Sequence, residues 1–136
     1  MDITLAPTKD IVRENTSEKI NKRIDLKMAI SGLYYSHKDV DKSAIEDRIK
    51  ELDREWDIER TLELNASLVA LSGVVLAATV NKKWLILPAI VTSFLVQHAV
   101  QGWCPPLPLF RKLGVRTQKE IDTERYRLAE LLKSKN

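Results

Sequence analysis

Charged and apolar residues are segregated along this chain rather than interleaved. Asp, Glu, Lys and Arg recur every few residues up to Glu63, but none occurs from Leu64 to Asn81 or from Trp84 to Phe110. A core helix of a soluble protein would keep a polar stripe, whereas these two runs show almost none. Because about twenty helical residues cross a hydrocarbon layer about 30 Å thick, residues 64–81 and 84–103 are each predicted to span a membrane.

Tryptophans mark the two ends of the second run. Trp84 and Trp103 would lie about 28 Å apart in a helix, which suits anchors at the two membrane interfaces. Only residues 81–83 separate the runs, so a tight turn must join two antiparallel helices. Pro88 lies early in the second helix, where membrane helices tolerate it. The pattern predicts an all-α fold built on an integral membrane two-helix hairpin.

Amphipathic helices are predicted before and after the hairpin, on its cytoplasmic side. Residues 1–42 are interpreted as a mobile N-terminus, Met1–Glu14, followed by a helix that begins at the cap pair Asn15 and Glu18 and ends near Tyr35. Its polar side is basic. Two placements are therefore open: in the headgroup region of an anionic leaflet, or packed on the next helix.

The next unit, residues 43–117, is predicted to contain one long helix that enters the bilayer, followed by the hairpin. Ser43 and Glu46 have the spacing of a capping box, and neither Gly nor Pro occurs between Ser43 and Gly73. Thr117 with Glu120 opens a last amphipathic helix, which occupies most of residues 118–136. The apolar faces are Ile45, Ile49, Leu52 and Trp56 for the long helix and Ile121, Leu128 and Leu132 for the last one.

Basic residues near the hairpin predict its orientation. Lys and Arg are more numerous beside the two outer ends of the hairpin than in the turn, so both termini are expected in the cytoplasm. Met1–Asn15 is acidic and polar, so no cleavable signal peptide is expected. The single cysteine, Cys104, agrees with a reducing compartment. The net charge of +3 comes without a recognition motif, so nucleic acid is not an expected partner.

Small residues form a stripe along the first span, where they would allow two helix backbones to approach closely. The stripe either packs the hairpin on itself or binds a second copy of the chain. Its members are Ala66, Ala70, Gly73 and Ala77.

Polar residues gather at the cytoplasmic ends of both spans. Antiparallel pairing about the turn would place Gln101 near Glu63, His98 near Asn65, and Gln97 near Ser67. Hydrogen bonds that fix the register of the hairpin are the favoured interpretation. His98 has no carboxylate or cysteine at ligand spacing, so no metal and no haem or other cofactor is expected.

Cys104 lies where the second span meets water, in the sequence Gly-Trp-Cys-Pro-Pro. A thiol at this place is expected to be accessible from the cytoplasm, which reactivity requires. The negative end of the preceding helix disfavours a thiolate, so an inert, packed cysteine is the favoured interpretation and a reactive thiol the alternative.

Residues 60–117 resemble the YgaP-like two-helix inner-membrane domain family, a bacterial domain of unknown function that elsewhere is fused to rhodanese. The resemblance rests on Arg60, Gly73, the pair Cys104-Pro105, the pair Leu113-Gly114, and Thr117. It implies a bacterial inner membrane, dimerisation through the membrane helices, and a link to persulfide sulfur. Because the first sixty residues hold no rhodanese-sized domain, a rhodanese-type sulfur donor would be a separate protein.

Together these features favour a non-catalytic inner-membrane protein, either a homodimer or an accessory or scaffold subunit of a larger membrane complex. No set of catalytic residues or phosphate-binding loop is recognisable, so an enzyme is not expected. The alternative is a persulfide or redox relay through Cys104. A third hypothesis is a small transport or electron-transfer unit built on His98.

Overall fold

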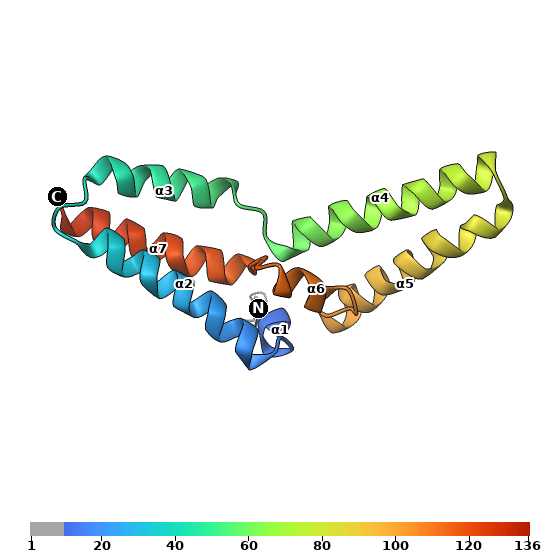
Figure 1. The fold of residues 1–136 in the computed structure, drawn as a ribbon, viewed down its shortest axis with the longest axis horizontal. Coiled ribbons are helices and arrows are strands. Elements are labelled where there is room, and N and C mark those ends of the chain that lie inside the picture. The colour runs from blue at the N-terminus through green and yellow to red at the C-terminus, as the bar shows by residue number, and fades with distance from the viewer. Residues whose placement is uncertain (1–9) are drawn as a thin grey trace, which may run out of the picture.

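The computed structural model describes residues 10–136, and this part of the chain contains helices and no strands. A hairpin of two helices and a bundle of three lie at opposite ends of an elongated molecule, with two short helices where they meet (Figure 1). In chain order the elements are α1 (Ile11–Glu14), α2 (Glu18–Ser36), α3 (Lys42–Arg54), α4 (Ile58–Thr79), the 3-10 helix η1 (Lys82–Leu85), α5 (Ile86–Gln101), α6 (Leu107–Lys112) and α7 (Gln118–Ser134).

The hairpin consists of α4 and α5, which pack against each other in antiparallel directions. The side chain of Asn81 accepts a hydrogen bond from the backbone of Lys83 and so starts η1 at the tip. Pro88 is the third residue of α5, where the first turn of a helix needs few backbone donors, and the helix continues beyond it. The predicted tight turn is confirmed.

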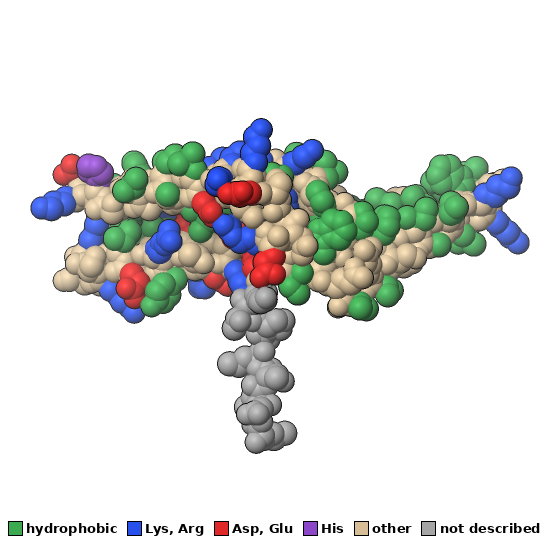
Figure 2. Space-filling view, turned by 90° about the horizontal axis from the view of Figure 1, so that it is seen from below, with side chains coloured by type: hydrophobic (Ala, Val, Ile, Leu, Met, Phe, Trp, Pro, Cys, Tyr) green, Lys and Arg blue, Asp and Glu red, His purple; other side chains and the backbone are tan. Residues whose placement is uncertain are grey.

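Two segments are long and apolar enough to cross a membrane, Lys42–Thr79 and Lys82–Gln101. In the most apolar window of each segment, only 11% and 0% of the residues are buried. A core helix of a soluble protein would be mostly buried, so these helices lack the protein cover that such a surface needs in water. Figure 2 shows the hairpin surface as largely hydrophobic, with Lys and Arg side chains at its tip.

The bundle consists of α2, α3 and α7. Ile45 and Leu52 of α3 and Ile121 and Leu128 of α7 are 0–2% exposed and form its core. The predicted apolar face of α7 is confirmed. Helix α2 packs on α7, which is its main neighbour in the bundle, rather than on α3, the next helix along the chain.

The predicted long helix was wrong, because α3 ends at Arg54 and α4 begins at Ile58. The backbone is extended at Glu55 and Asp57. Asp57 caps α4 by accepting from the backbone of Arg60, and Ile58 donates its N–H to the carbonyl of Arg116, 2.9 Å away. The break lets α3 fold back on α7. The predicted unit 43–117 is therefore divided between the bundle and the hairpin.

The same break corrects the predicted face of α3. Ile45 and Leu52 are buried and Ile49 is half-buried, but Trp56 lies beyond the helix and is 41% exposed. The guanidinium of Arg60 lies over the Trp56 ring, 4.3 Å from the ring centroid, in a cation–π contact.

Part of the predicted mobile N-terminus is ordered. Met1–Lys9 lie outside the described residues, but Asp10–Glu14 form and cap α1, whose Val12 is only 6% exposed. Val12 packs with Ile58 and Leu62 of α4 and with Leu107 of α6. Helix α1 therefore fills the corner between the hairpin and the bundle.

Two of the three predicted capping boxes are not formed. Asn15 terminates α1, and α2 begins after Ser17. Helix α3 begins after Asp41, and its hydroxyl residue Ser43 bonds to the Asp41 carboxylate instead. The capping box at the start of α7 is confirmed, with both hydrogen bonds present.

Candidate functional site

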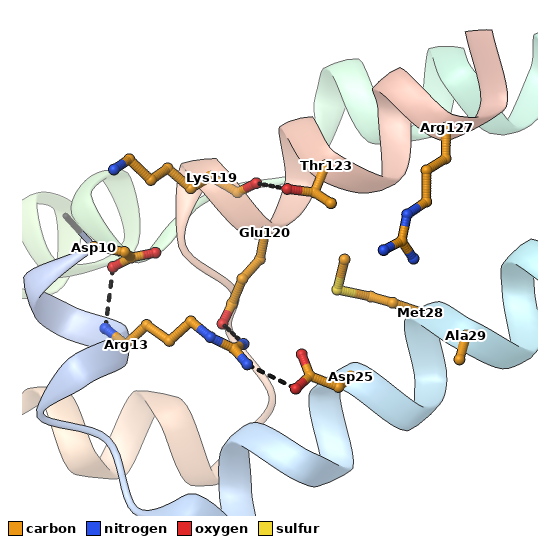
Figure 3. A pocket seen from close by; sticks show the side chains of 9 residues that line it. All are labelled: Asp10, Arg13, Asp25, Met28, Ala29, Lys119, Glu120, Thr123 and Arg127. Carbon is orange, nitrogen blue, oxygen red and sulfur yellow. Dashed lines mark hydrogen bonds and ion pairs between the residues drawn. The ribbon is translucent and has the colours of Figure 1, made fainter. Parts of the chain in front are cut away.

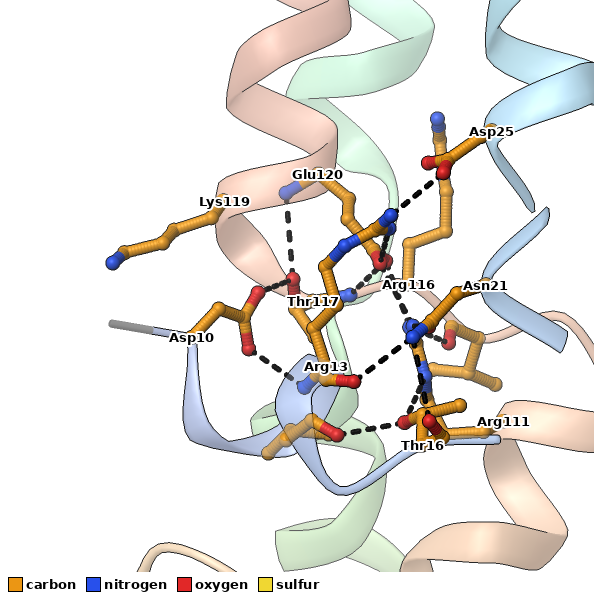
Figure 4. A network of polar contacts seen from close by, with 12 residues as sticks. Asp10, Arg13, Thr16, Asn21, Asp25, Arg111, Arg116, Thr117, Lys119 and Glu120 are labelled. Atoms are coloured by element: carbon orange, nitrogen blue, oxygen red, sulfur yellow. Dashed lines mark hydrogen bonds and ion pairs between the residues drawn. The ribbon is translucent and has the colours of Figure 1, made fainter. Parts of the chain in front are cut away.

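A buried ion pair between Arg111 of α6 and Glu120 of α7 lies where the hairpin and the bundle meet (Figure 4). Arg111 is 1% exposed and Glu120 is 4% exposed. Two parallel hydrogen bonds of 2.7 Å join the guanidinium to the carboxylate. The other guanidinium donors go to the Thr16 hydroxyl, the Asn21 side-chain oxygen and the Val115 carbonyl. All five Arg111 N–H groups are therefore used, as a buried guanidinium requires.

Glu120 also connects α7 to the N-terminal helices. It accepts a 2.7 Å hydrogen bond from Nη1 of Arg13 in α1, and Nη2 of the same guanidinium pairs with Asp25 of α2 at 2.7 Å. The Glu120 carboxylate accepts in addition from the backbone N–H of Thr117, and the Thr117 hydroxyl bonds to Asp10. One carboxylate thus links α1 and α2 to α6 and α7.

A second buried carboxylate, Glu124, lies one turn further along α7. It accepts hydrogen bonds from Arg116, from Arg48 of α3 and from the hydroxyl of Ser31 of α2. Arg116 also donates two hydrogen bonds to the carboxylate of Glu55, in the break between α3 and α4. We call the ion pairs around Glu120 and Glu124 the junction network.

The junction network keeps its acidic groups charged. Burial alone would raise the pKa of Glu120, but hydrogen bonds from Arg111, the Thr117 N–H and Arg13 outweigh it and lower the pKa below its ordinary value. The pKa of Glu124 is lowered in the same way, by Arg116 and Ser31. These buried charges have complete hydrogen-bond partners. The chemistry that the arrangement supports is therefore fixed ion pairing rather than proton transfer.

The predicted stripe of small residues faces α5. Gly73 is buried, and Ala66, Ala70 and Ala77 are half-buried, whereas most other residues of α4 are exposed. A Cβ added at Gly73 would lie 2.5 Å from Cδ of Pro88. Of the two roles left open by the sequence, the structure therefore shows the packing of the hairpin on itself.

The predicted polar cluster assembles only in part. His98 Nε2 lies 2.6 Å from the carboxylate of Glu59 rather than near Asn65, its expected neighbour. Glu59 precedes Asn65 by one to two turns of α4. Asn65 bonds to a carbonyl of its own helix, and Gln97 bonds to Gln101 within α5. Glu63, Ser67 and Gln101 are exposed.

Pro88 lies against Gly73, and His98 lies against Glu59, so residues of α5 meet earlier residues of α4 than equal spacing from the turn predicts. Nδ1 of His98 is buried and finds no partner within the described part of the chain.

Cys104 is 0% exposed and packs between α1, α4 and α6. The expectation of an accessible thiol was wrong, because α1 and Leu107 cover it. Burial, and to a smaller extent the charge of Glu59, raises the pKa of the thiol. Both effects disfavour the thiolate that a sulfur relay needs.

The two predicted interfacial anchors lie at opposite ends of the hairpin. Trp84 is 42% exposed in the turn at the tip. Trp103 follows α5 at the base, where it packs against the cluster that contains Cys104. Their positions suit the two interfaces of a bilayer.

A cleft of about 510 Å³ lies between α1, α2 and α7 beside the junction network (Figure 3). Its charged side chains balance, with three acidic and three basic residues around an apolar floor that includes Met28. They are Asp10, Asp25, Glu120, Arg13, Lys119 and Arg127. Because this lining carries no net charge, the cleft offers no strong field for an ionic ligand.

Sequence reasoning missed the junction network. Its partners are as far as 107 residues apart, and the local pattern around Arg111 and Arg116 indicates only a basic stretch after the hairpin. The one local signal was the capping box of Thr117 and Glu120, which fixes the carboxylate that the network uses.

Comparisons with known proteins give no relative. No family model matches this sequence, and neither a curated protein nor a solved structure matches it.

Proposed function

We propose that the protein is a non-catalytic membrane module whose hairpin crosses the bilayer while its three-helix bundle remains in the cytoplasm as a dimerising, accessory or scaffold unit. The observation that carries this proposal is the apolar surface of the hairpin. Along α4 and α5 large apolar side chains such as Leu71, Ile86 and Val100 are 61–79% exposed. Lipid is the solvent in which such a surface is stable.

The polar groups of the chain support a structural role. The buried acids and bases bond to one another, the small stripe packs the hairpin, and Cys104 is enclosed. These groups hold the bundle at a fixed position on the hairpin. A rigid helical platform on a membrane anchor suits the positioning of other protein chains.

The bacterial inner membrane as the location of the protein is part of the proposal and rests only on the residues by which 60–117 resemble the YgaP-like family, since no family model matches the chain. The excess of Lys and Arg beside the outer ends of the hairpin supports cytoplasmic termini. The structure adds no support for the persulfide relay, because the sulfur atom is covered.

Fractionation and topology mapping test the proposal. The full chain is expected in the membrane pellet after a carbonate wash, and a reporter fused after Asn136 is expected to be active only on the cytoplasmic side. A soluble chain, or a periplasmic C-terminus, would refute the membrane module or its orientation. Purification in mild detergent, with identification of co-purifying proteins at fixed stoichiometry, tests the scaffold role.

A further inference from the structure

A second cleft, with an excess of positive charge, opens between α2, α3 and α7 next to the end of α6. Its volume is about 230 Å³, and buried Ile24 and Met28 belong to its lining. The cleft beside α1 carries equal numbers of acidic and basic side chains, whereas this one has four basic side chains and two acidic ones. They are Arg23, Lys27, Arg48, Arg116, Glu55 and Glu124. This cleft therefore has a field that attracts anions.

Two of the four basic side chains are held by carboxylates. Arg116 bonds to Glu55 and Glu124, and Arg48 bonds to Glu124 and to the exposed carboxylate of Glu51. These contacts fix both guanidinium groups in the wall of the cleft. Within the described part of the chain, they leave no carboxylate of the lining for the other two basic residues.

The uncompensated charges are those of Arg23 and Lys27, one turn apart on α2. Nη2 of Arg23 donates a 2.6 Å hydrogen bond to the carbonyl of Lys112, which is a neutral acceptor and leaves the positive charge in place. Lys27 has no hydrogen-bond or ion-pair partner among residues 10–136. The acidic residue between them, Asp25, pairs with Arg13 in the cleft beside α1. Like charges at i and i+4 repel each other, and an anion bound between them removes that repulsion.

The cleft lies at the base of the hairpin, at the depth expected for lipid headgroups. Gly114 belongs to its lining and follows α6, which lies where the hairpin and the bundle meet (Figure 1). Beside it, Leu109 and Leu113 are 60% and 72% exposed. Exposed apolar side chains next to basic ones at the end of a membrane span are typical of a segment in contact with the bilayer interface.

We propose that this cleft binds a phosphate group, held by Arg23 and Lys27 and supplied either by the headgroup of an anionic phospholipid or by free phosphate. Phosphate oxygens are strong acceptors, and guanidinium and ammonium groups are the donors that suit them. The volume is below the about 300–1,000 Å³ of sites for drug-sized ligands, so it suits one small group. The phosphate chemistry goes beyond the proposed function, whereas lipid as its source rests on that function. A lipid held here would attach the bundle to the membrane surface in addition to the hairpin.

Native mass spectrometry of the full chain in a neutral detergent tests the lipid source. From an equimolar mixture of phosphatidylglycerol and phosphatidylcholine, the parent is expected to retain phosphatidylglycerol about tenfold more often, because the choline cation opposes binding in a positive cleft. Arg23→Gln/Lys27→Gln should abolish this preference. Lys19→Gln/Lys22→Gln removes the same charge from the same helix outside the cleft and should keep it. An equal loss in both double variants would indicate attraction to general surface charge and would overturn the site.

Inorganic phosphate tests the free anion. If free phosphate occupies the cleft, its addition at constant ionic strength should raise the melting temperature of the parent, and Lys27→Gln should reduce this rise. The Lys27 side chain has no partner among the described residues, so this variant loses no bond of the folded chain. An equal rise in parent and variant would indicate exclusion of phosphate from the protein surface, which counts against the site.

The two measurements together identify the source of the phosphate. Preference for phosphatidylglycerol without stabilisation by inorganic phosphate assigns the lipid, and the reverse assigns the free anion. Absence of both effects, or effects that the cleft variants do not change, refutes the inference. Carbonate extraction separates this result from the membrane proposal: a chain that leaves the pellet refutes the membrane module and the lipid source, while the phosphate measurement still tests the cleft.

Discussion

Loss of one charge from the buried Arg111–Glu120 pair should release the N-terminal helices from the hairpin. Glu120→Gln keeps the shape and a hydrogen-bonding oxygen, but it leaves the guanidinium of Arg111 buried without its counterion. Because Arg111 is 1% exposed, water cannot replace the carboxylate unless the structure opens. Breaking a buried pair by removing one partner costs about 3–5 kcal/mol.

That free energy corresponds to a factor of about 100 to 4,000 in the equilibrium for local opening, since about 1.4 kcal/mol is tenfold. Arg13 and Asp25 depend on the same carboxylate, so the opening should include α1 and the start of α2. Hydrogen exchange of the detergent-solubilised chain, followed by mass spectrometry, is the assay. Exchange should accelerate by this factor in α1 and α2, and amides in the middle of α4 and α5 should keep their rates.

Two controls define the expected outcome. Asp53→Asn breaks the exposed pair of Asp53 with Arg125, which is expected to change exchange less than about fivefold. Arg111→Met/Glu120→Gln removes both buried charges and should exchange more slowly than Glu120→Gln alone. Two outcomes would show that the junction network does not hold the bundle on the hairpin. One is that Glu120→Gln changes exchange no more than Asp53→Asn does, and the other is that the double variant exchanges faster than Glu120→Gln alone.

Three further results are expected. Gly73→Val should force α4 and α5 apart, because the new Cβ would lie 2.5 Å from Cδ of Pro88. The melting temperature in detergent should therefore fall. Ala78→Val, on the exposed side of α4, should leave the melting temperature unchanged. Alkylation of Cys104 at neutral pH should be slower than that of a free thiol, because burial raises its pKa and covers the sulfur; a rate equal to that of an unfolded control would contradict the structure. The two buried carboxylates of the junction network have lowered pKa values, so the stability that they contribute is complete above the ordinary carboxyl pKa and is lost as pH falls through the lower folded-state value. Exchange protection of α1 and α2 should therefore be constant from pH 7 to about 5 and fall below about pH 4. A loss of protection already at pH 6 would contradict this assignment.

The sequence alone determined the parts of the fold that depend on composition and local chemistry. The two long uncharged runs are helices, as their length and composition predict, and the turn between them is fixed by the few residues available. The capping box at Thr117 is likewise local, because its two hydrogen bonds span three residues. Absence of Gly and Pro, in contrast, did not ensure one continuous helix.

The break at Glu55–Asp57 depends on partners from elsewhere in the chain. Arg116 binds Glu55 through its side chain and Ile58 through its backbone carbonyl, 58 or more residues away, and these contacts favour an extended linker over continued helix. The same limit applies to Cys104. Its position after a membrane span indicated access to water, but α1 packs over it from the far end of the chain.

Local pattern therefore determined which segments are helices and which of them are apolar enough for lipid. Tertiary structure decided where the helices go: α3 back onto α7, α1 into the corner, and the stripe of small residues against α5. The physical reason is that helix formation depends on neighbours within one or two turns, whereas burial of a charge or a thiol depends on which distant groups arrive to satisfy or cover it. The pair Arg23 and Lys27 belongs to both levels, since its spacing is visible in the sequence but only the folded bundle places it in one cleft with Arg48 and Arg116.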